Sequence, residues 1–409
     1  MSRVLAYTSP ARGHLYPLVP TLLELAGRGH DVCVRTLPSE VDRMRSLGFD
    51  ARAIDDRVSA IELADWKAKG ARAALVASAT AFAERSQFDA PDLEGAIAEV
   101  RPDAVIVDTN SWGAQAAAEA WGGPWASLLP YPVPLSSVDA PPFGLGLPPA
   151  RGVVGRVRDR AIRPIVMGTV ARATLPRYNV VRSRYGLRPF AGADELYLAP
   201  PLTLYLTAEP FEYPRRDWPT SFALIGPCDW DPPEEDPEWL ASVDRPLVLV
   251  TTSSEYQGDE KLVRSALEAM AREDLFVVAT VPSADPTAFS VPGNARVEKY
   301  LPHARLLKRA ACAVTHGGMG ATQKALAHGV PVVAVPFGRD QFEVARRVEV
   351  AGAGVRLTAP RATPERLRDA VRVAMSRRAG AERIAASFAA AGGPSAAADR
   401  LEALISLPA

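Results

Sequence analysis

The sequence alternates short apolar runs with stretches of helical periodicity, a pattern that restricts the chain to parallel α/β folds. In the first half, the runs predicted to form strands are RVLAYT (3–8), DVCVRTL (31–37), DARAI (50–54), AVIVD (104–108) and WASLL (125–129). Helical spacing follows the first run, and an Ala-rich helix is predicted over 111–121. Because parallel strands need helical crossovers, we expect a doubly wound sheet with helices on both faces.

The same alternation restarts after residue 245 and predicts a second sheet domain. Strands are expected at 246–252, 275–280, 311–316 and 331–336, and helices over 259–272, 319–328, 340–351 and 363–405. Between the halves, the acidic and Pro-rich stretch CDWDPPEEDPEW is typical of a linker. The sequence therefore predicts two Rossmann-like domains facing each other across a cleft. The expected boundaries are an N-terminal domain over 1–227, a linker over 228–245, a C-terminal domain over 246–385 and a C-terminal helix over 386–409, for which packing against the N-terminal domain is one arrangement.

Segments outside this alternation carry their own signals. Residues 59–86 and 152–186 have helical character but do not belong to the strand–helix series, while Pro and Gly are too dense over 130–149 for a regular element. A long loop of this kind is usually functional or mobile in a compact domain.

Charge and cysteine content limit the partners and the compartment. Lys and Arg total 47, as do Asp and Glu, so no basic face for nucleic acid is expected. The three cysteines are isolated and lack metal-ligand spacing, which indicates free thiols in a reducing cytoplasm. The N-terminus lacks signal-peptide features and no apolar run reaches spanning length, so a cytoplasmic chain without stable membrane insertion is predicted. The sequence leaves a homodimer open.

The most informative segment is ACAVTHGGMGATQKALAHGVPVVAVP, which predicts a strand, a glycine-rich turn, a helix and a second strand. Glycines at 317, 318 and 320 let a ligand approach the backbone closely. The helix that follows offers unpaired amides and the positive end of its dipole, which together favour an anion. Neither the P-loop nor the dinucleotide fingerprint is present. A diphosphate site is the favoured interpretation, and a tight turn that binds nothing is the alternative.

A candidate base lies near the N-terminus. His14 follows the first predicted strand and Asp108 ends the strand AVIVD, so both fall at the carboxyl edge of the sheet, where open α/β sheets bind ligands. An imidazole suits general base catalysis at neutral pH, and a carboxylate on its other nitrogen would fix the tautomer. The alternatives are a histidine bonded to the turn backbone and an aspartate capping the helix that begins at Ser111.

Two signatures in this order resemble the UDP-glycosyltransferase superfamily. HGGMG followed by GVPVVAVPFGRDQ is similar to its donor-binding signature, and ARGHLYPLVPTLLELAGRGHDV matches near the N-terminus, so the resemblance covers the whole chain. It is similar in particular to the bacterial natural-product branch with the GT-B fold. The resemblance implies a hexosyltransferase that moves a sugar, with inversion, from a UDP- or TDP-sugar to a hydroxyl of a small apolar natural product. It implies no metal and no cofactor, the nucleotide sugar being a co-substrate.

The resemblance also implies roles for individual residues. His14 corresponds to the general base and Asp108 to its partner. His316 and the amides from Gly318 to Ala321 would hold the diphosphate, Asp340 and Gln341 the sugar hydroxyls, and Tyr300 the nucleobase. The donor-binding residues implied are Ser253, Ser254, Tyr300, His316, Gly317, Gly318, Gly320, Ala321, Thr322, Asp340 and Gln341. A cap on the following helix is the alternative for Asp340.

Four positions depart from the family pattern. Tyr300 stands where Trp is usual, Ala321 replaces a Ser or Thr, and Val344 replaces an Asn. Lys324 stands where the family often has a Glu that bonds the ribose, and lysine has no acceptor. We expect Lys324 to add positive charge to the phosphate site instead.

Aromatic residues near the same sheet edge favour an apolar acceptor. Trp112, Tyr131 and Phe143 are predicted to line its site, with a core position as the alternative for each, whereas Trp121 and Trp125 are expected in the core.

A literal DxD metal motif, Asp229-Trp230-Asp231, lies in the linker, where we expect it to be solvated. Of the remaining histidines, His30 is expected to be structural and His328 to complement a helix dipole, while His303 either touches the nucleotide or begins a helix. The competing functions are a nucleotide-sugar epimerase on the same fold and a nucleotide-sugar-binding activator protein.

Overall fold

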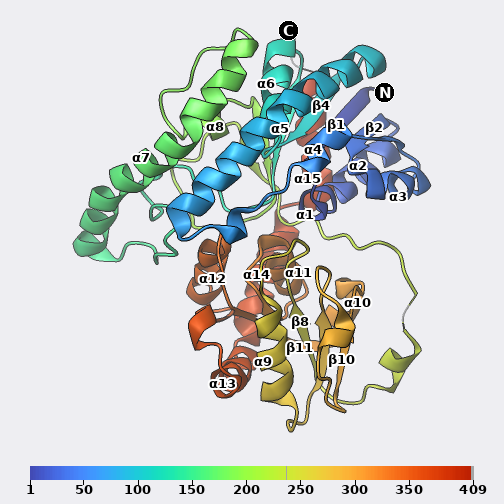
Figure 1. Cartoon of the computed structure of the whole chain (residues 1–409), viewed down its shortest axis with the longest axis vertical. Coiled ribbons are helices and arrows are strands. Elements are labelled where there is room, and N and C mark those ends of the chain that lie inside the picture. Colours follow the sequence, from blue (N-terminus) through green and yellow to red (C-terminus); the bar gives the residue numbers. More distant parts are fainter. Residues whose placement is uncertain (236, 407–409) are drawn as a thin grey trace.

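The computed structural model describes residues 1–235 and 237–406 as two α/β lobes, one above the other in Figure 1. Each lobe is built on a parallel sheet, so the predicted fold class is confirmed. Residue 236 of the predicted linker and residues 407–409 of the predicted C-terminal segment lie outside the described residues.

The N-terminal lobe contains a seven-stranded sheet with the order β3-β2-β1-β4-β5-β6-β7. Its strands are β1 (Arg3–Tyr7), β2 (Asp31–Thr36), β3 (Asp50–Ala53), β4 (Ala104–Asp108), β5 (Trp125–Leu129), β6 (Leu202–Tyr205) and β7 (Phe222–Leu224). In register, Ala6 of β1 pairs with Val34 on one side and with Ile106 on the other. The sequence did not single out β6, whose four residues LTLY are too short to show a period.

The C-terminal lobe contains a six-stranded sheet with the order β10-β9-β8-β11-β12-β13. Its strands are β8 (Leu247–Thr251), β9 (Phe276–Thr280), β10 (Ala295–Glu298), β11 (Ala310–Thr315), β12 (Val332–Ala334) and β13 (Gly354–Arg356). The edge strands β10 and β13 were also missed, because they are short and only partly buried.

Helices cover both faces of each sheet. In the N-terminal lobe they are α1 (Arg12–Leu15), α2 (Val19–Gly27), α3 (Val41–Ser46), α4 (Asp56–Ala60), α5 (Ala71–Val100), α6 (Trp112–Trp121), α7 (Gly152–Arg184) and α8 (Glu195–Leu198). In the rest of the chain they are α9 (Glu260–Met270), α10 (His303–Leu307), α11 (Met319–Ala327), α12 (Gln341–Val350), α13 (Pro364–Met375), α14 (Arg378–Ala390) and α15 (Gly393–Ile405). Residues 130–149 form neither helix nor strand, as predicted.

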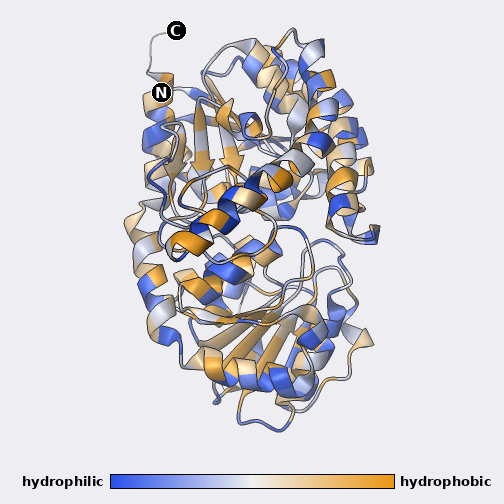
Figure 2. Ribbon diagram, turned by 90° about the vertical axis from the view of Figure 1, so that its left-hand side faces the viewer, coloured by the Kyte–Doolittle hydropathy of each residue, from blue (hydrophilic) through white to orange (hydrophobic). Residues whose placement is uncertain are grey.

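Burial on both faces explains why the strands are apolar without alternation. In the N-terminal sheet, Val4 and Leu128 belong to the cluster on one face, and Leu5 and Val105 to the cluster on the other. The C-terminal sheet is sandwiched in the same way. Figure 2 shows the strands of both lobes in hydrophobic colours beneath helices of mixed colour.

The end of the chain returns to the first lobe. Helix α15 packs against α2, and its Leu401 is fully buried in the N-terminal core (Figure 1). Arg28 bonds Asp399 at 2.7 Å, and His30 Nε2 lies 3.0 Å from a Glu402 oxygen. His30 therefore serves as a structural tie.

Buried charges join the lobes. Arg347 of α12 donates to Glu212, which follows β6, at 2.8 Å, and to Glu343 at 3.1 Å, and both carboxylates are almost completely buried. The amides of Gly144 and Gly146, in the Pro-rich segment 130–149, each donate to Glu343 at 2.8 Å. Because losing one partner would leave a buried charge unpaired, this network fixes how the lobes sit.

Among the described residues, no helix is both long and apolar enough to cross a membrane.

Candidate functional site

Each sheet has one switch point, where successive connections of the chain leave in opposite directions along the sheet. In the N-terminal sheet it lies between the neighbours β1 and β4, and in the C-terminal sheet between β8 and β11. The carboxyl ends of neighbouring parallel strands form a crevice at such a point. His14 follows β1 and Asp108 ends β4, while Ser253 follows β8 and His316 follows β11.

The structure brings His14 and Asp108 together. His14 Nδ1 lies 2.6 Å from Asp108 Oδ2, and the Asp108 side chain is fully buried while 17 % of the His14 side chain remains exposed. The other Asp108 oxygen accepts a hydrogen bond from the backbone N–H of Asn110 at 2.7 Å. Helix α6 begins after Ser111 with no side-chain cap, so Asp108 orients the imidazole and does not cap that helix. The imidazole of His14 is bonded to a carboxylate, not to the turn backbone.

Electrostatics favour proton uptake at His14. Burial lowers the pKa of the imidazole, but the charge and hydrogen bond of Asp108, aided by Glu255 and Asp340, outweigh burial and raise that pKa above its usual value. Glu255 and Asp340 belong to the other lobe, so His14 faces that lobe.

A residue that the sequence analysis missed contacts the free side of the imidazole. The Asn110 amide Nδ2 lies 3.5 Å from His14 Nε2, and the Tyr131 hydroxyl donates to Asn110 Oδ1 at 3.0 Å. With Nδ1–H pointing at Asp108, Nε2 carries the lone pair, and the amide donates to it. The only sequence signal for Asn110 was its position two residues after Asp108.

In the second lobe, the turn between β11 and α11 presents backbone amides. Gly317 has φ +85°, which favours glycine, and a Cβ on Gly318 would lie 2.3 Å from His316 Nε2. A Cβ on Gly320 would meet nothing within 4 Å, so no protein packing requires glycine there. The first amides of α11 have no intrahelical partner and can receive an anion.

Burial keeps the imidazole of His316 neutral. Burial lowers the pKa of its imidazole to about 4, and its Nδ1 is buried without a hydrogen-bond partner among the described residues. A buried polar atom without a partner is costly, and a ligand oxygen at Nδ1 would remove that cost.

Thr322 is a correction to the predicted donor set. The Thr322 hydroxyl pairs with Thr315 Oγ1 at 3.0 Å, its amide donates to the Gly318 carbonyl at 3.1 Å, and the residue is fully buried. Both polar groups are therefore satisfied inside the lobe. Ala321, one residue earlier, remains partly exposed in the first turn of α11.

The turn after β8 braces the start of α12. Ser253 is buried and its hydroxyl accepts from Gln257 Nε2 at 2.7 Å, whereas Ser254 is exposed. Gln341 Nε2 donates to Gln257 Oε1 at 2.6 Å, and Gln341 Oε1 accepts the amides of Phe337 and Gly338. Gln341 is therefore a buried brace, which departs from its predicted role as a sugar ligand.

Asp340 differs from its neighbour. It is partly exposed, it makes no side-chain cap bond to α12, and burial raises the pKa of its carboxyl to about 6, against the effect of Arg339 and His14. Asp340 therefore stands at the N-cap position of α12 without capping the helix through its side chain. Arg339, in the left-handed region at φ +52°, spans the lobes by pairing with Asp65 at 2.6 Å and Glu255 at 3.0 Å.

Lys324 does not add charge to the predicted phosphate site, contrary to expectation. Its Nζ lies 2.7 Å from Asp229 and 2.6 Å from Asp231, and it also donates to the Trp230 carbonyl. Asp231 further accepts the Ala304 amide at 2.8 Å, and His328 Nε2 lies 3.0 Å from Asp229. The motif predicted to be solvated is instead folded onto α11 and α10, because it neutralises a lysine.

The remaining histidine and Tyr300 lie beside this linker cluster. His303 begins α10, and its Nε2 lies 2.9 Å from the Thr280 hydroxyl. The Tyr300 hydroxyl is buried without a partner among the described residues, and burial followed by the charge of Asp231 raises its pKa.

The predicted acceptor aromatics separate into different environments. Trp112 is 6 % exposed and packs between Phe82 and Tyr178, so its prediction as a lining residue is wrong and it belongs to the core. Tyr131 lies 6.0 Å from the His14 ring, centroid to centroid. Phe143 is partly exposed in the segment that docks on α12. Trp121 and Trp125 pack in the core, as predicted.

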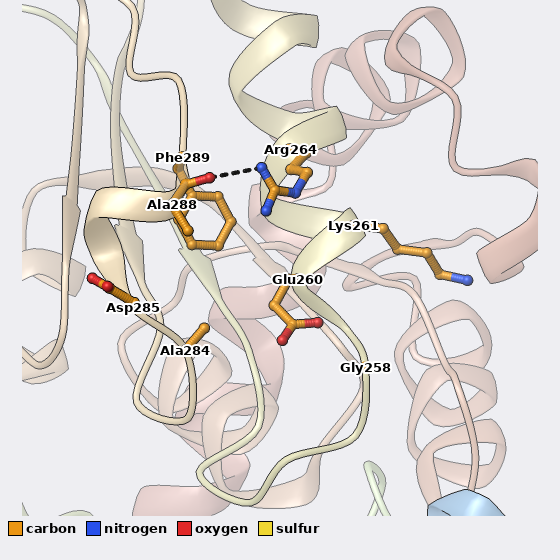
Figure 3. Close-up of a pocket in the computed structure, with 8 residues that line it drawn as sticks. All are labelled: Gly258, Glu260, Lys261, Arg264, Ala284, Asp285, Ala288 and Phe289. Carbon is orange, nitrogen blue, oxygen red and sulfur yellow. Dashed lines mark hydrogen bonds between the residues drawn. The ribbon is translucent and has the colours of Figure 1, made fainter.

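A cavity of about 440 Å³ lies in the second lobe (Figure 3). It lies between the start of α9 and the connection after β9, where Arg264 donates to the Ala288 carbonyl at 2.9 Å. Its lining residues are Gly258, Glu260, Lys261, Arg264, Ala284, Asp285, Ala288 and Phe289. None of the predicted site residues contributes to it, so the site is defined by the facing switch points and not by this cavity.

Comparisons with known proteins agree with this architecture. Residues 264–404 match the family described as erythromycin biosynthesis protein CIII-like, C-terminal domain. The chain is 33 % identical to 4'-demethylrebeccamycin synthase of Lentzea aerocolonigenes, over 99 % of this chain and all of that protein. Among solved structures, the glycosyltransferase VinC in complex with dTDP is 25 % identical with a TM-score of 0.69, covering 98 % of this chain and 99 % of that one. The glycosyltransferase of kitacinnamycin is similar in fold, at 24 % identity and a TM-score of 0.75, covering 100 % of this chain and 99 % of that one.

Two doubly wound lobes with facing switch points define a GT-B glycosyltransferase. The chain belongs to the UDP-glycosyltransferase superfamily, in its natural-product branch, whose relatives act in antibiotic biosynthesis.

Proposed function

We propose that the protein transfers a sugar from a UDP- or TDP-sugar to a hydroxyl of a small apolar natural product, with inversion at the anomeric carbon. The acceptor hydroxyl replaces the 3.5 Å contact of Asn110 Nδ2 with His14 Nε2, Nε2 takes the acceptor proton as the oxygen attacks, and Asp108 stabilises the imidazolium that forms. The 2.6 Å contact between His14 and a fully buried Asp108 is the observation that carries this proposal.

The donor side is proposed to stabilise the leaving diphosphate. The amides at the start of α11 and the unpartnered Nδ1 of neutral His316 supply hydrogen bonds where negative charge develops. Preorganised donors of this kind can replace a metal, so we propose that the reaction needs neither a metal nor another cofactor. Asp340, whose charge helps to raise the pKa of His14, is proposed to bind sugar hydroxyls.

The acceptor is proposed to lie beside His14, Tyr131 and Phe143. Tyr131 lies near the base, and Phe143 belongs to the loop that bridges the lobes. The buried free thiols and the absence of a spanning helix among the described residues suit a protein of the cytoplasm.

The replacement His14→Ala tests the proposal most directly. Transfer should fall by roughly 10² to 10⁴, while the melting-temperature increase produced by UDP or TDP should persist. His30→Ala is the matched control, because His30 ties α15 in the same lobe without facing the site. Unchanged turnover in His14→Ala would refute the assigned base, and loss of nucleotide binding would mean that His14 belongs to the donor site.

A further inference from the structure

The first half of α7 has an apolar face that no other element covers. Its exposed members are Val153, Val154, Val157 and Ile165, with exposed fractions of 66, 84, 60 and 67 %. In Figure 1, α7 runs along the outer edge of the N-terminal lobe. On the second lobe, by contrast, exposed valines occur singly, as Val291, Val350 and Val373 do.

These four side chains share one side of the helix. At about 100° per residue, they fall within an arc of roughly 120°, close to the width of an ordinary buried stripe. The opposite side of the helix faces the protein, where Asp159 is buried. The apolar arc of this segment therefore points away from the body of the protein.

Arginines border this face. Helix α7 contains eight arginines and a single acidic residue, Asp159, which pairs with Arg158 at 2.8 Å. Arg156 and Arg160 are exposed along one edge of the apolar arc, and Arg151 is exposed at its start. Within the part of the chain that the structure describes, none of these three has an ion-pair partner. Because the whole chain carries no net charge, the positive charge is local to this helix.

We propose that this face of α7 docks the protein on an anionic lipid bilayer, with the valines and Ile165 in the interfacial region. Apolar side chains flanked by arginines, with no acidic residue on the same face, complement such a surface on two counts. The apolar groups leave water, and the guanidinium groups meet lipid phosphates. The helix lies in the plane of the membrane surface and does not span it.

Cosedimentation of the full chain with vesicles tests this proposal. Phosphatidylcholine vesicles containing phosphatidylglycerol should retain the protein at low salt, whereas phosphatidylcholine alone should retain it weakly, and added salt should release it. The double variant V154S/V157S should bind at least roughly tenfold more weakly. R156Q/R160Q should lose roughly fivefold in vesicle affinity for each arginine replaced, and this loss should appear mainly with the anionic vesicles.

Matched controls come from the second lobe. Val373→Ser and Arg366→Gln change exposed residues of α13 and should bind vesicles like the unchanged protein. Melting temperatures of all variants should match, since only exposed side chains are altered. Failure of the unchanged protein to sediment with either vesicle would overturn the proposal. So would a concentration-dependent dimer that V154S/V157S abolishes, because a second copy would then cover the face.

Discussion

The two switch points share one strand topology, but they differ in whether their polar groups already have hydrogen-bond partners. At the N-terminal one, side chains already bond one another in a chain from Asp108 through His14 and Asn110 to Tyr131. At the C-terminal one, the polar groups are backbone amides and an imidazole whose Nδ1 has no partner in the described chain. The polar side chains of the first switch point are already paired with one another, whereas the second keeps polar groups without a partner in the described chain, which in the proposed function a ligand would bind. This difference fits the proposed function, in which the base needs a fixed tautomer before the substrate arrives and the diphosphate site must keep its donors free.

The largest expected effect comes from breaking the completed network. Asp108→Asn should lower kcat by on the order of 10³ to 10⁴, because the imidazolium loses its carboxylate. Since Asp108 raises the pKa of His14, the acidic limb of the kcat/KM profile should move to lower pH in the variant. A pH–rate series measures both effects. If the acidic limb of the kcat/KM profile does not move in Asp108→Asn, a group other than His14 sets that limb.

A pair of glycine variants examines the second site. Gly318→Ala should displace His316, whose Nε2 would lie 2.3 Å from the new Cβ, and should weaken UDP or TDP binding by roughly tenfold or more. Gly320→Ala meets no protein atom, so the protein without nucleotide should be as stable as before, or more stable by up to about 1 kcal/mol. Calorimetric titration should nevertheless show weaker nucleotide binding by Gly320→Ala. Unaltered affinity in that variant would mean that the diphosphate does not approach this turn.

A smaller effect is expected at Asn110. Its amide donates to the lone pair of His14 Nε2 and so favours the neutral imidazole, hence Asn110→Ala should raise the pKa of His14. The acidic limb should then move upward, opposite to the shift in Asp108→Asn, with only a several-fold loss of rate. NMR titration of the imidazole measures the shift without relying on turnover. Tyr131→Phe, which removes the bond orienting Asn110, should shift the pKa in the same direction by less.

The smallest effect concerns the support beneath the first site. Asp89 lies under the start of α6, where a Cβ on Gly113 would meet its Oδ1 at 2.1 Å, and burial raises the pKa of its carboxyl to about 8. The native state thus retains a proton that the unfolded chain releases near its ordinary pKa of about 4. The stability that this retained proton gives the native state is fully present below the unfolded-state pKa of about 4. It is lost as pH rises through the native pKa of about 8.

In Asp89→Asn, Tm should therefore fall less between pH 5 and pH 9. The decrease in Tm over this range should be roughly 2–4 °C smaller than in the unchanged protein. Thermal unfolding across that range checks the slope. Exposed Asp274→Asn is the control and should keep the original slope. A slope equally steep in Asp89→Asn would assign the pH dependence to another group.

The local pattern was sufficient for the long, buried elements and insufficient for the short edge strands. Continuous apolar runs such as AVIVD identify strands buried on both faces, whereas β10 and β13 are too short and too exposed to be distinguished. Residues adjacent to strand ends were placed correctly, because parallel topology brings those ends together. That rule located His14 and Asp108, whereas the resemblance to the superfamily pointed to His316.

The sequence by itself determined the strand–helix alternation, the glycine turn and the histidine that follows β1, since these depend on local periodicity and backbone freedom. Only the tertiary structure decided which polar groups remain available. Lys324 is neutralised by Asp229 and Asp231 from a distant segment, Trp112 is covered by α5 and α7, and Gln341 is bound by Gln257. The physical reason is that burial and charge pairing depend on partners far apart in the chain, which no local pattern records.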